Sequence, residues 1–436
     1  MPKRFCCSKC RLLSTLIVAI VFQSASADDW PQWRGVDRDG TWNEKGIIEK
    51  FDAKQIPIKW SVEIGPGYSG PTVAKGRVYV TDRLVDPKQV ERVHCYSEAN
   101  GEHIWTHQYD CDYVEVGYKA GPRAAVTIDN GIAFSLGTMG NLFALDAATG
   151  EVKWDRNLNE DFKIKMPIWG ISSAPLIYGE LIVLQIGGAD GACIVALNKS
   201  TGAEVWRALD DRASYSAPIV IQQGGKDVLI CWTGDNVAGL EPLTGNVLWK
   251  SAMKPTRMVI GIATPVVEKN RIFVTSFYDG SKMVEYDPNS PSATELWRSL
   301  GPDEKNTQAL HSIISTPLMI DGYVYGVDSY GELRCLDAKT GERIWEDQTA
   351  TPRARWSNIH MVRNGENIWM FNEAGELVIG RFSPKGFTEI SRANLIEPTK
   401  DQLSRRNGVC WAHPAYANGH VFIRNDKRLV SADLRK

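Results

Sequence analysis

The chain has 436 residues, with 50 basic and 52 acidic side chains and a net charge of -2 at pH 7. This near balance gives no indication of a nucleic acid or a strongly acidic partner, which would require concentrated positive charge. A hydrophobic fraction of 43% with 23% charged residues is typical of a folded soluble protein and argues against disorder and multi-span membrane topology. The chain also has 15 Trp and 38 Gly, a pairing that suits many short strands joined by tight turns.

The first 27 residues have the features of a secretory signal. Basic residues precede an apolar run and small residues follow it: Lys3, Arg4, Lys9 and Arg11, then residues 12–22, then Ala25-Ser26-Ala27. We expect cleavage near Ala27 and export to the periplasm or the extracellular space. The alternative is an uncleaved anchor, but a helix of eleven residues is much shorter than the hydrocarbon core of roughly 30 Å. We therefore do not expect an integral membrane protein.

Six of the nine cysteines lie beyond this segment, at Cys95, Cys111, Cys193, Cys231, Cys335 and Cys410. They are widely separated and form no CxxC pair of the kind that binds a metal or exchanges disulfides. Four of them stand in apolar, strand-like contexts, where a thiol usually behaves as a small core residue. We expect buried free thiols, with one disulfide as the alternative.

A repeat of about 47 residues runs through the rest of the chain. Tryptophan recurs at nearly even intervals, at Trp60, Trp105, Trp154, Trp206, Trp249, Trp297 and Trp345. The turn pattern AxDxxTGxxxW precedes most of these residues and is complete at Ala144–Trp154. In this pattern the Asp carboxylate can accept hydrogen bonds from turn amides, and the Gly can adopt a positive φ. The pattern therefore predicts a hairpin whose second strand leads to the tryptophan.

Each unit also contains an earlier strand pair, such as residues 71–73 followed by Gly76–Val80. Units of this length with four short antiparallel strands are typical of the blades of a β-propeller. We expect the tryptophan to lie between adjacent blades, where a large ring buries about 150–250 Å².

The number of units predicts an all-β, eight-bladed propeller. Six units end at Trp105 through Trp345, and residues 346–436 provide nearly two more. The last unit stops at its third strand, and its missing outer strand is expected from the segment around Trp60. The predicted organisation is a signal peptide at 1–27, an N-terminal extension at 28–54 and the propeller at 55–436. Seven blades is the alternative.

Alignment of the units on a recurring proline places one small residue per unit at the inner strand: Ser69, Ala124, Ser173, Ser216, Ala263, Ser315, Asn358 and Ala412. Crowding of the inner strands around one axis would explain this pattern. The residue before each is larger in most units: Tyr68, Arg123, Ser172, Tyr215, Ile262, Ile314, Ser357 and Trp411.

These larger residues and others nearby predict a basic, aromatic-lined funnel at one mouth of the channel, suited to a flat or anionic ligand. The candidate ligand-binding residues are Arg123, Trp169, Tyr215, Arg257, His311, Arg355, Trp356, Arg405 and Trp411, with Arg406 nearby. The alternative is that each arginine pairs with a loop carboxylate and each aromatic residue packs between blades.

The AxDxxTGxxxW repeat resembles the tryptophan-docking repeat of the pyrroloquinoline quinone (PQQ) propellers. That group includes quinoprotein alcohol dehydrogenases and non-enzymatic relatives such as the outer-membrane assembly lipoprotein BamB. Trp30-Pro-Gln-Trp33-Arg-Gly35 and Gly121-Pro-Arg123 are similar to segments of exported bacterial PQQ-like repeat proteins. The resemblance covers roughly residues 55–436 and is specific for the fold.

The resemblance also implies what an enzyme of this group would need. Methanol-dehydrogenase-type members stack the quinone beneath a disulfide between adjacent cysteines and hold Ca²⁺ with Glu, Asn and Asp beside a catalytic Asp. The adjacent pair in this chain, Cys6-Cys7, lies in the predicted signal, and the inner-strand segments contain no acidic cluster suited to Ca²⁺. We therefore predict no catalytic residue and no metal ligand.

The expected function is that of a non-catalytic scaffold in the cell envelope that binds an envelope protein or a polymer. The alternative is a quinoprotein dehydrogenase that uses PQQ with calcium to oxidise an alcohol, sugar or polyol.

Overall fold

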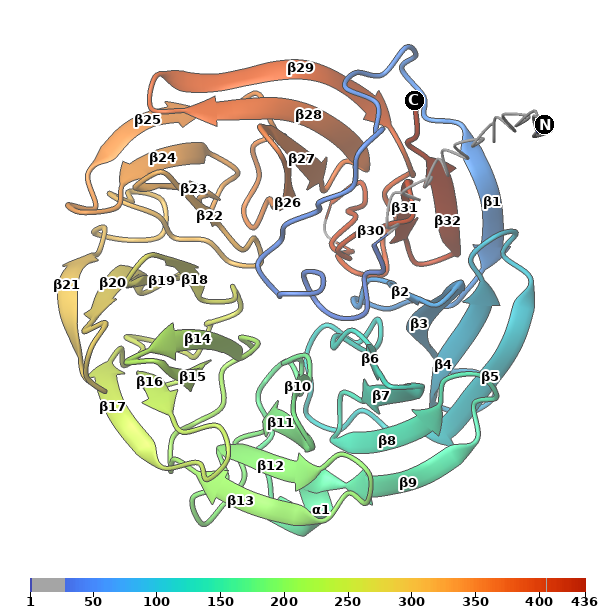
Figure 1. Ribbon diagram of the computed structural model, residues 1–436, viewed down its shortest axis with the longest axis horizontal. Helices are drawn as coiled ribbons and strands as arrows, with labels where there is room; N and C mark the ends of the chain where they lie inside the picture. Colours follow the sequence, from blue (N-terminus) through green and yellow to red (C-terminus); the bar gives the residue numbers. More distant parts are fainter. Residues whose placement is uncertain (2–27, 405) are drawn as a thin grey trace.

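The computed structural model describes residue 1, residues 28–404 and residues 406–436, so the predicted signal segment lies outside the described residues. The described chain forms eight four-stranded antiparallel sheets arranged in a ring (Figure 1). The helix α1 (Leu158–Phe162) is a single short turn beside the second blade. No helix in this described part has the length and apolar character needed to cross a membrane.

Each blade is built from strands that follow one another in the chain. The first four blades are β2 (Thr72–Ala74), β3 (Arg77–Leu84), β4 (Val90–Ser97) and β5 (His103–Asp110); β6 (Thr127–Asp129), β7 (Ile132–Leu136), β8 (Asn141–Asp146) and β9 (Val152–Asn157); β10 (Leu176–Tyr178), β11 (Leu181–Gln185), β12 (Ile194–Asn198) and β13 (Glu204–Ala208); and β14 (Ile219–Gln223), β15 (Lys226–Trp232), β16 (Asn236–Leu240) and β17 (Val247–Ala252). The next three are β18 (Val266–Glu268), β19 (Arg271–Ser276), β20 (Gly280–Tyr286) and β21 (Ala293–Ser299); β22 (Leu318–Ile320), β23 (Tyr323–Val327), β24 (Leu333–Asp337) and β25 (Arg343–Asp347); and β26 (Ile359–Asn364), β27 (Asn367–Asn372), β28 (Glu376–Ser383) and β29 (Gly386–Asn394).

The eighth blade joins the two ends of the propeller. Its strands are β30 (Ala415–Ala417), β31 (His420–Arg424), β32 (Arg428–Asp433) and β1 (Ile58–Glu63). β1 pairs antiparallel with β32, and Trp60 lies opposite Ser431. The predicted eight-bladed ring is therefore confirmed, and the alternative of seven blades is wrong.

The recurring tryptophan docks one blade on the next. Trp105 is buried between the first two blades, and its Nε1 donates a hydrogen bond of 3.2 Å to the carbonyl of Ala147. Gly150 in the same turn has a φ of +76°, and a Cβ there would lie 2.7 Å from the Trp105 ring. The Asp146 carboxylate accepts hydrogen bonds from the amides of Ala148 and Thr149. The glycine therefore satisfies both the turn conformation and the close approach of the indole.

One docking contact uses a substitute for the missing glycine. The hairpin at residues 287–292 lacks the Thr-Gly sequence, and Trp249 of the preceding blade donates instead to Oε1 of Gln223, at 3.0 Å. The Gln223 amide nitrogen in turn donates to the carbonyls of Asp287, Ser290 and Ser292. A buried glutamine thus links tryptophan and hairpin where the repeat has diverged.

The N-terminal segment (residues 28–57) crosses the ring and reaches its centre (Figure 1). Backbone bridges and side-chain hydrogen bonds attach it to four blades, at Trp30–Val73, Arg38–Ala174, Thr41–Arg363 and Ile47–Arg435. Val73 and Ala174, the partners of Trp30 and Arg38, follow the small inner residues of their blades in the chain. The segment therefore closes the channel at the end opposite the loops that precede the inner strands.

All six described cysteines are free and buried, as expected. Burial raises the pKa of the Cys231 thiol well above its ordinary value.

Candidate functional site

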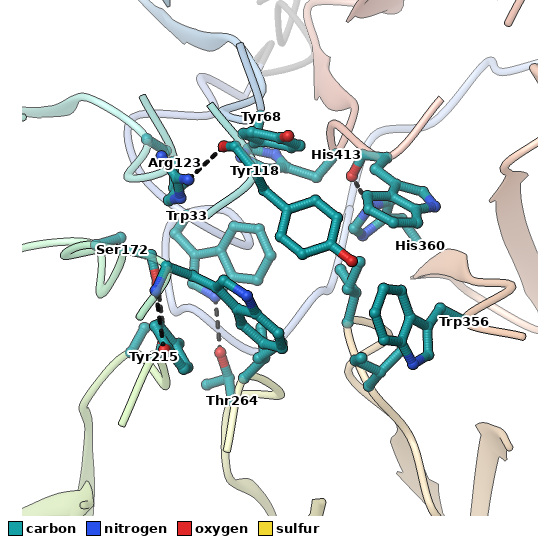
Figure 2. Close-up of a pocket in the computed structure, with 18 residues that line it drawn as sticks. Trp33, Tyr68, Tyr118, Arg123, Ser172, Tyr215, Thr264, Trp356, His360 and His413 are labelled. Atoms are coloured by element: carbon teal, nitrogen blue, oxygen red, sulfur yellow. Dashed lines mark hydrogen bonds between the residues drawn. The ribbon is translucent and has the colours of Figure 1, made fainter. Parts of the chain in front are cut away.

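The described residues enclose a pocket on the propeller axis, with a cavity volume of about 150 Å³ (Figure 2). Seven of the eight positions that precede the small inner residues line it: Tyr68, Arg123, Ser172, Tyr215, Ile262, Ile314 and Trp411. Residues two positions further along the inner strands, such as Ala125, Ala174 and Ala217, also line it. Because all eight blades contribute, the pocket is the mouth of the central channel. We call it the axial pocket.

The small inner residues are small because the inner strands meet there. All eight are at most 2% exposed. The Ser216 hydroxyl donates to the carbonyl of Ala263 in the next blade at 3.0 Å. The position that follows is also crowded in the first blade, where a Cβ on Gly70 would lie only 1.9 Å from the carbonyl oxygen of His413. Larger side chains at the eight small positions would separate the blades.

The structure brings five of the nine candidate residues together in the pocket. Arg123, Trp169, Tyr215, Trp356 and Trp411 line it. Arg257, His311 and Arg355 are not among its lining residues. Arg405 lies outside the described residues.

Arg123 is held by the protein itself. Its guanidinium donates to the carbonyls of Gly121, Gly117 and Tyr118 at 2.7, 2.8 and 2.5 Å. It also lies 5.1 Å from the centre of the Tyr68 ring, within cation–π range. Arg123 therefore fixes the loop that carries Tyr118, and most of its donors are engaged before any ligand arrives.

The other basic candidates also have partners in the protein. Arg257 and Arg355 both lie near the Glu304 carboxylate, at 3.8 and 3.6 Å. Arg406 pairs with Glu373, with nitrogen–oxygen distances of 2.5 and 3.1 Å. The pairing of these arginines with carboxylates agrees with the alternative interpretation of the funnel. A ligand-binding role for these residues stays a prediction.

His311 is likewise held by the backbone. Its buried ring contacts the Phe277 carbonyl at 3.0 Å through Nδ1 and accepts a hydrogen bond from the Gly301 amide through Nε2. Burial lowers its pKa.

Several lining residues were not among the candidates, and Trp33 of the N-terminal segment is the clearest case. Its indole Nε1 donates to Thr264 Oγ1 at 2.7 Å, and its ring meets His413 edge-to-face at a centroid distance of 4.5 Å (Figure 2). The WPQWRG motif marked this segment, but its contact with a residue 231 positions away left no local signal. Trp33 forms the floor of the axial pocket.

Tyr118 is the second missed residue, and it stands over the centre of the pocket (Figure 2). Its ring meets Trp169 and Trp356 edge-to-face at 5.7 and 5.8 Å. It lies in the irregular segment between two blades, for which the repeat makes no prediction.

The two histidines of the pocket are neutral at neutral pH. Burial lowers the pKa of His360 to about 4 and that of His413 to about 3, and the nearby His360 further lowers the value for His413. The His360 Nε2 lies 2.9 Å from the carbonyl of Trp411, so this nitrogen carries the hydrogen. His413 stands one position after a small inner residue, where most other units also have a small side chain. Its larger side chain was the sequence signal that it lines the pocket.

Comparison with known proteins identifies the family. A family model described as outer membrane protein assembly factor BamB matches residues 89–347 and 258–379, more than half of the chain. The chain belongs to this family of PQQ-like propellers.

Relatives within and around this family fall into two groups. The quinohemoprotein alcohol dehydrogenase of Comamonas testosteroni is 29% identical over 197 residues, which cover 42% of this chain and 26% of that protein. The outer membrane protein assembly factor BamB of Shewanella oneidensis is 27% identical over 208 residues, which cover 46% of this chain and 51% of that protein. The chain thus spans about a quarter and about half of the length of these relatives.

Solved structures share the fold. BamB from Moraxella catarrhalis has a TM-score of 0.58 at 18% identity, covering 87% of this chain and 97% of that one. The Comamonas testosteroni dehydrogenase has a TM-score of 0.61 at 14% identity, covering 93% of this chain and 80% of that one. A BamB structure and a quinohemoprotein alcohol dehydrogenase structure therefore share this architecture.

The lining of the axial pocket in this PQQ-like propeller suits a quinone only in part. Its aromatic walls suit a flat ring. Ca²⁺ requires six to eight oxygen ligands, largely carboxylates. None of the described lining residues is Asp, Glu or Lys. Nor do the described residues contain a group of three or more His, Cys, Asp or Glu placed to hold a metal. The residues present therefore do not fit a calcium-bound quinone.

Proposed function

We propose that the protein is an exported, non-catalytic PQQ-like propeller that acts as a binding or assembly scaffold in the cell envelope. The composition of the axial pocket carries this proposal. General acid–base catalysis requires a group whose pKa lies near the working pH. The titratable lining groups are neutral histidines, tyrosines and an internally bonded arginine. The match to the BamB family supports the same function.

The outer rim offers surface for an envelope partner. The outermost strand of a blade is paired on one side only, so its other edge is open to an added strand. Exposed aliphatic residues stand on these strands in six blades, at Ile104, Val152, Val205, Val247, Ile344 and Ile390, each 39–50% exposed. These features support docking of a protein through the blade edges.

Photo-crosslinking in the intact host tests the scaffold function. A benzophenone amino acid replaces Val205 on β13, and the matched control carries it at Val36, which is 56% exposed on the N-terminal segment. We expect an adduct with an envelope protein from position 205 and none from position 36, read by mass spectrometry. The same amino acid at Ile344 on β25 provides a second rim position. Recovery of only the uncrosslinked chain from both rim positions would contradict the proposal.

The second candidate function is a PQQ-dependent dehydrogenase acting on an alcohol, sugar or polyol. The match to the Comamonas testosteroni enzyme and the aromatic walls of the pocket favour it. The purified chain, mixed with PQQ and CaCl₂, is assayed for dye reduction with ethanol, glycerol and glucose. We expect no turnover. Reproducible turnover with any of these would replace the scaffold with the enzyme.

A further inference from the structure

The polar groups of the axial pocket are mostly engaged within the protein. The Tyr68 hydroxyl donates to the carbonyl of Gln402 at 3.1 Å. The Tyr215 hydroxyl accepts from the Trp169 amide at 3.3 Å, and the Trp411 indole donates to Glu373 at 3.2 Å. Trp33 and Thr264 bond to each other, as described above. The pocket therefore offers a ligand mainly aromatic faces and methyl groups.

The charge of the lining disfavours ions of either sign. His360 and His413 are uncharged, and no described lining residue supplies a carboxylate to pair with a cation. The Arg123 guanidinium is a cation and so repels other cations, although the surrounding aromatic faces would otherwise attract one. An anion would lose its hydration and find the Arg123 donors already engaged with carbonyls. An uncharged ligand avoids both penalties.

The shape of the pocket favours a planar ring. Trp33 closes the floor, and Tyr118 and Trp356 present ring faces or edges at the mouth (Figure 2). Trp169 also lines the pocket and meets the Tyr118 ring edge-to-face. The volume of about 150 Å³ equals that of an apolar cavity known to hold a benzene molecule. Offset or edge-to-face contacts add about 0.5–1.5 kcal/mol per aromatic pair beyond burial.

We propose that the axial pocket is a binding site for a small, uncharged compound with one planar aromatic ring. The site is distinct from the blade edges that would dock an envelope protein. It also differs from a calcium-quinone site, because it selects against the charge that such a group carries. The proposal does not depend on the scaffold function, since a partner at the rim leaves the axial mouth open.

Three probes of similar size test the selection by charge. Isothermal titration calorimetry with the mature chain at pH 7.5 compares p-cresol, benzoate and phenyltrimethylammonium. We expect p-cresol to bind at one site with a Kd at least tenfold lower than either ion. Equal or tighter binding of an ion, or no saturable binding of p-cresol, would overturn the proposal.

Filling the pocket locates the site. Ala217→Leu projects a larger side chain from the wall, and Ile262→Phe fills the mouth if the first variant is unstable. The matched control is Ala148→Leu on an exposed turn of the second blade. We expect p-cresol affinity to fall at least tenfold in either pocket variant and to stay unchanged in the control, with thermal unfolding confirming that each protein is folded. Unchanged affinity in a folded pocket variant would place the site elsewhere.

Discussion

The rim of the propeller repeats one arrangement of residues in most blades, whereas the equivalent positions at the axis hold five residue types in eight blades. At the rim, a tryptophan packs on the turn glycine of the next blade, as Trp105 does on Gly150. At the axis, the equivalent positions include Arg123, Tyr215 and Trp411. Each rim contact joins only two neighbouring blades, so one solution can be copied. The axial residues all meet in one space, so copies of one large side chain would collide.

The largest expected effect is on rim docking. Trp105→Ala removes a buried indole and its hydrogen bond to Ala147, so we expect a loss of about 3–5 kcal/mol in the free energy of unfolding. The matched change at the axis is Trp169→Ala, which removes a half-buried ring and should cost clearly less. Urea unfolding followed by far-UV circular dichroism compares the two. Equal losses would show that the axis contributes to stability as much as the rim.

The next effect is a pH dependence that arises at the axis. His360 and His413 have folded-state pKa values of about 4 and about 3, below the unfolded value of about 6.5, so the unfolded chain binds more protons below pH 6.5. Their contribution is complete above that pH and is lost as the pH falls toward the folded values. Between pH 7.5 and 5 we expect each histidine to account for about 2 kcal/mol of lost stability.

His413→Phe separates this effect from the titration of carboxylates. The variant should lose less stability than the wild type between the same two pH values, by about 2 kcal/mol. Urea midpoints measured for each protein relative to its own value at pH 7.5 provide the comparison. If the variant and the wild type lost the same stability between the two pH values, His413 would not be buried as a neutral group.

A smaller effect distinguishes the two roles of the turn glycine. Gly131→Ala, at φ +81° with no atom within 4 Å of the added Cβ, measures the cost of the left-handed conformation, about 1 kcal/mol. Gly150→Ala adds contact with Trp105 at 2.7 Å and should cost about 1–3 kcal/mol more. Thermal unfolding midpoints of the two variants give the difference. Equal shifts would mean that the indole moves aside without cost.

The rim was predictable from the sequence because its contacts are local or nearly so. The Asp146 turn, the Gly150 conformation and the hairpin to Trp154 all lie within eleven residues. Their regular recurrence then indicated the number of blades. The Gln223 substitution was not predictable, because its amide meets a hairpin more than sixty residues away.

The axis was only partly predictable. Alignment of the units identified seven of the pocket positions, because equivalent positions in equivalent units must face the same channel. The alignment does not predict what each side chain bonds to. It suggested an arginine free to bind an anion, whereas the Arg123 donors meet the carbonyls of its own loop.

The sequence by itself determined the repeating unit, the eight blades and the closure by β1, since these follow from short-range pattern and from the need to pair every strand. Only the tertiary structure decided that Trp33 closes the floor, that the two pocket histidines are neutral and that the Arg123 donors are engaged. The physical reason is that these properties depend on side chains from all eight blades and the N-terminal segment meeting in one small space. Their burial and their partners, rather than their identities, set the charge that remains.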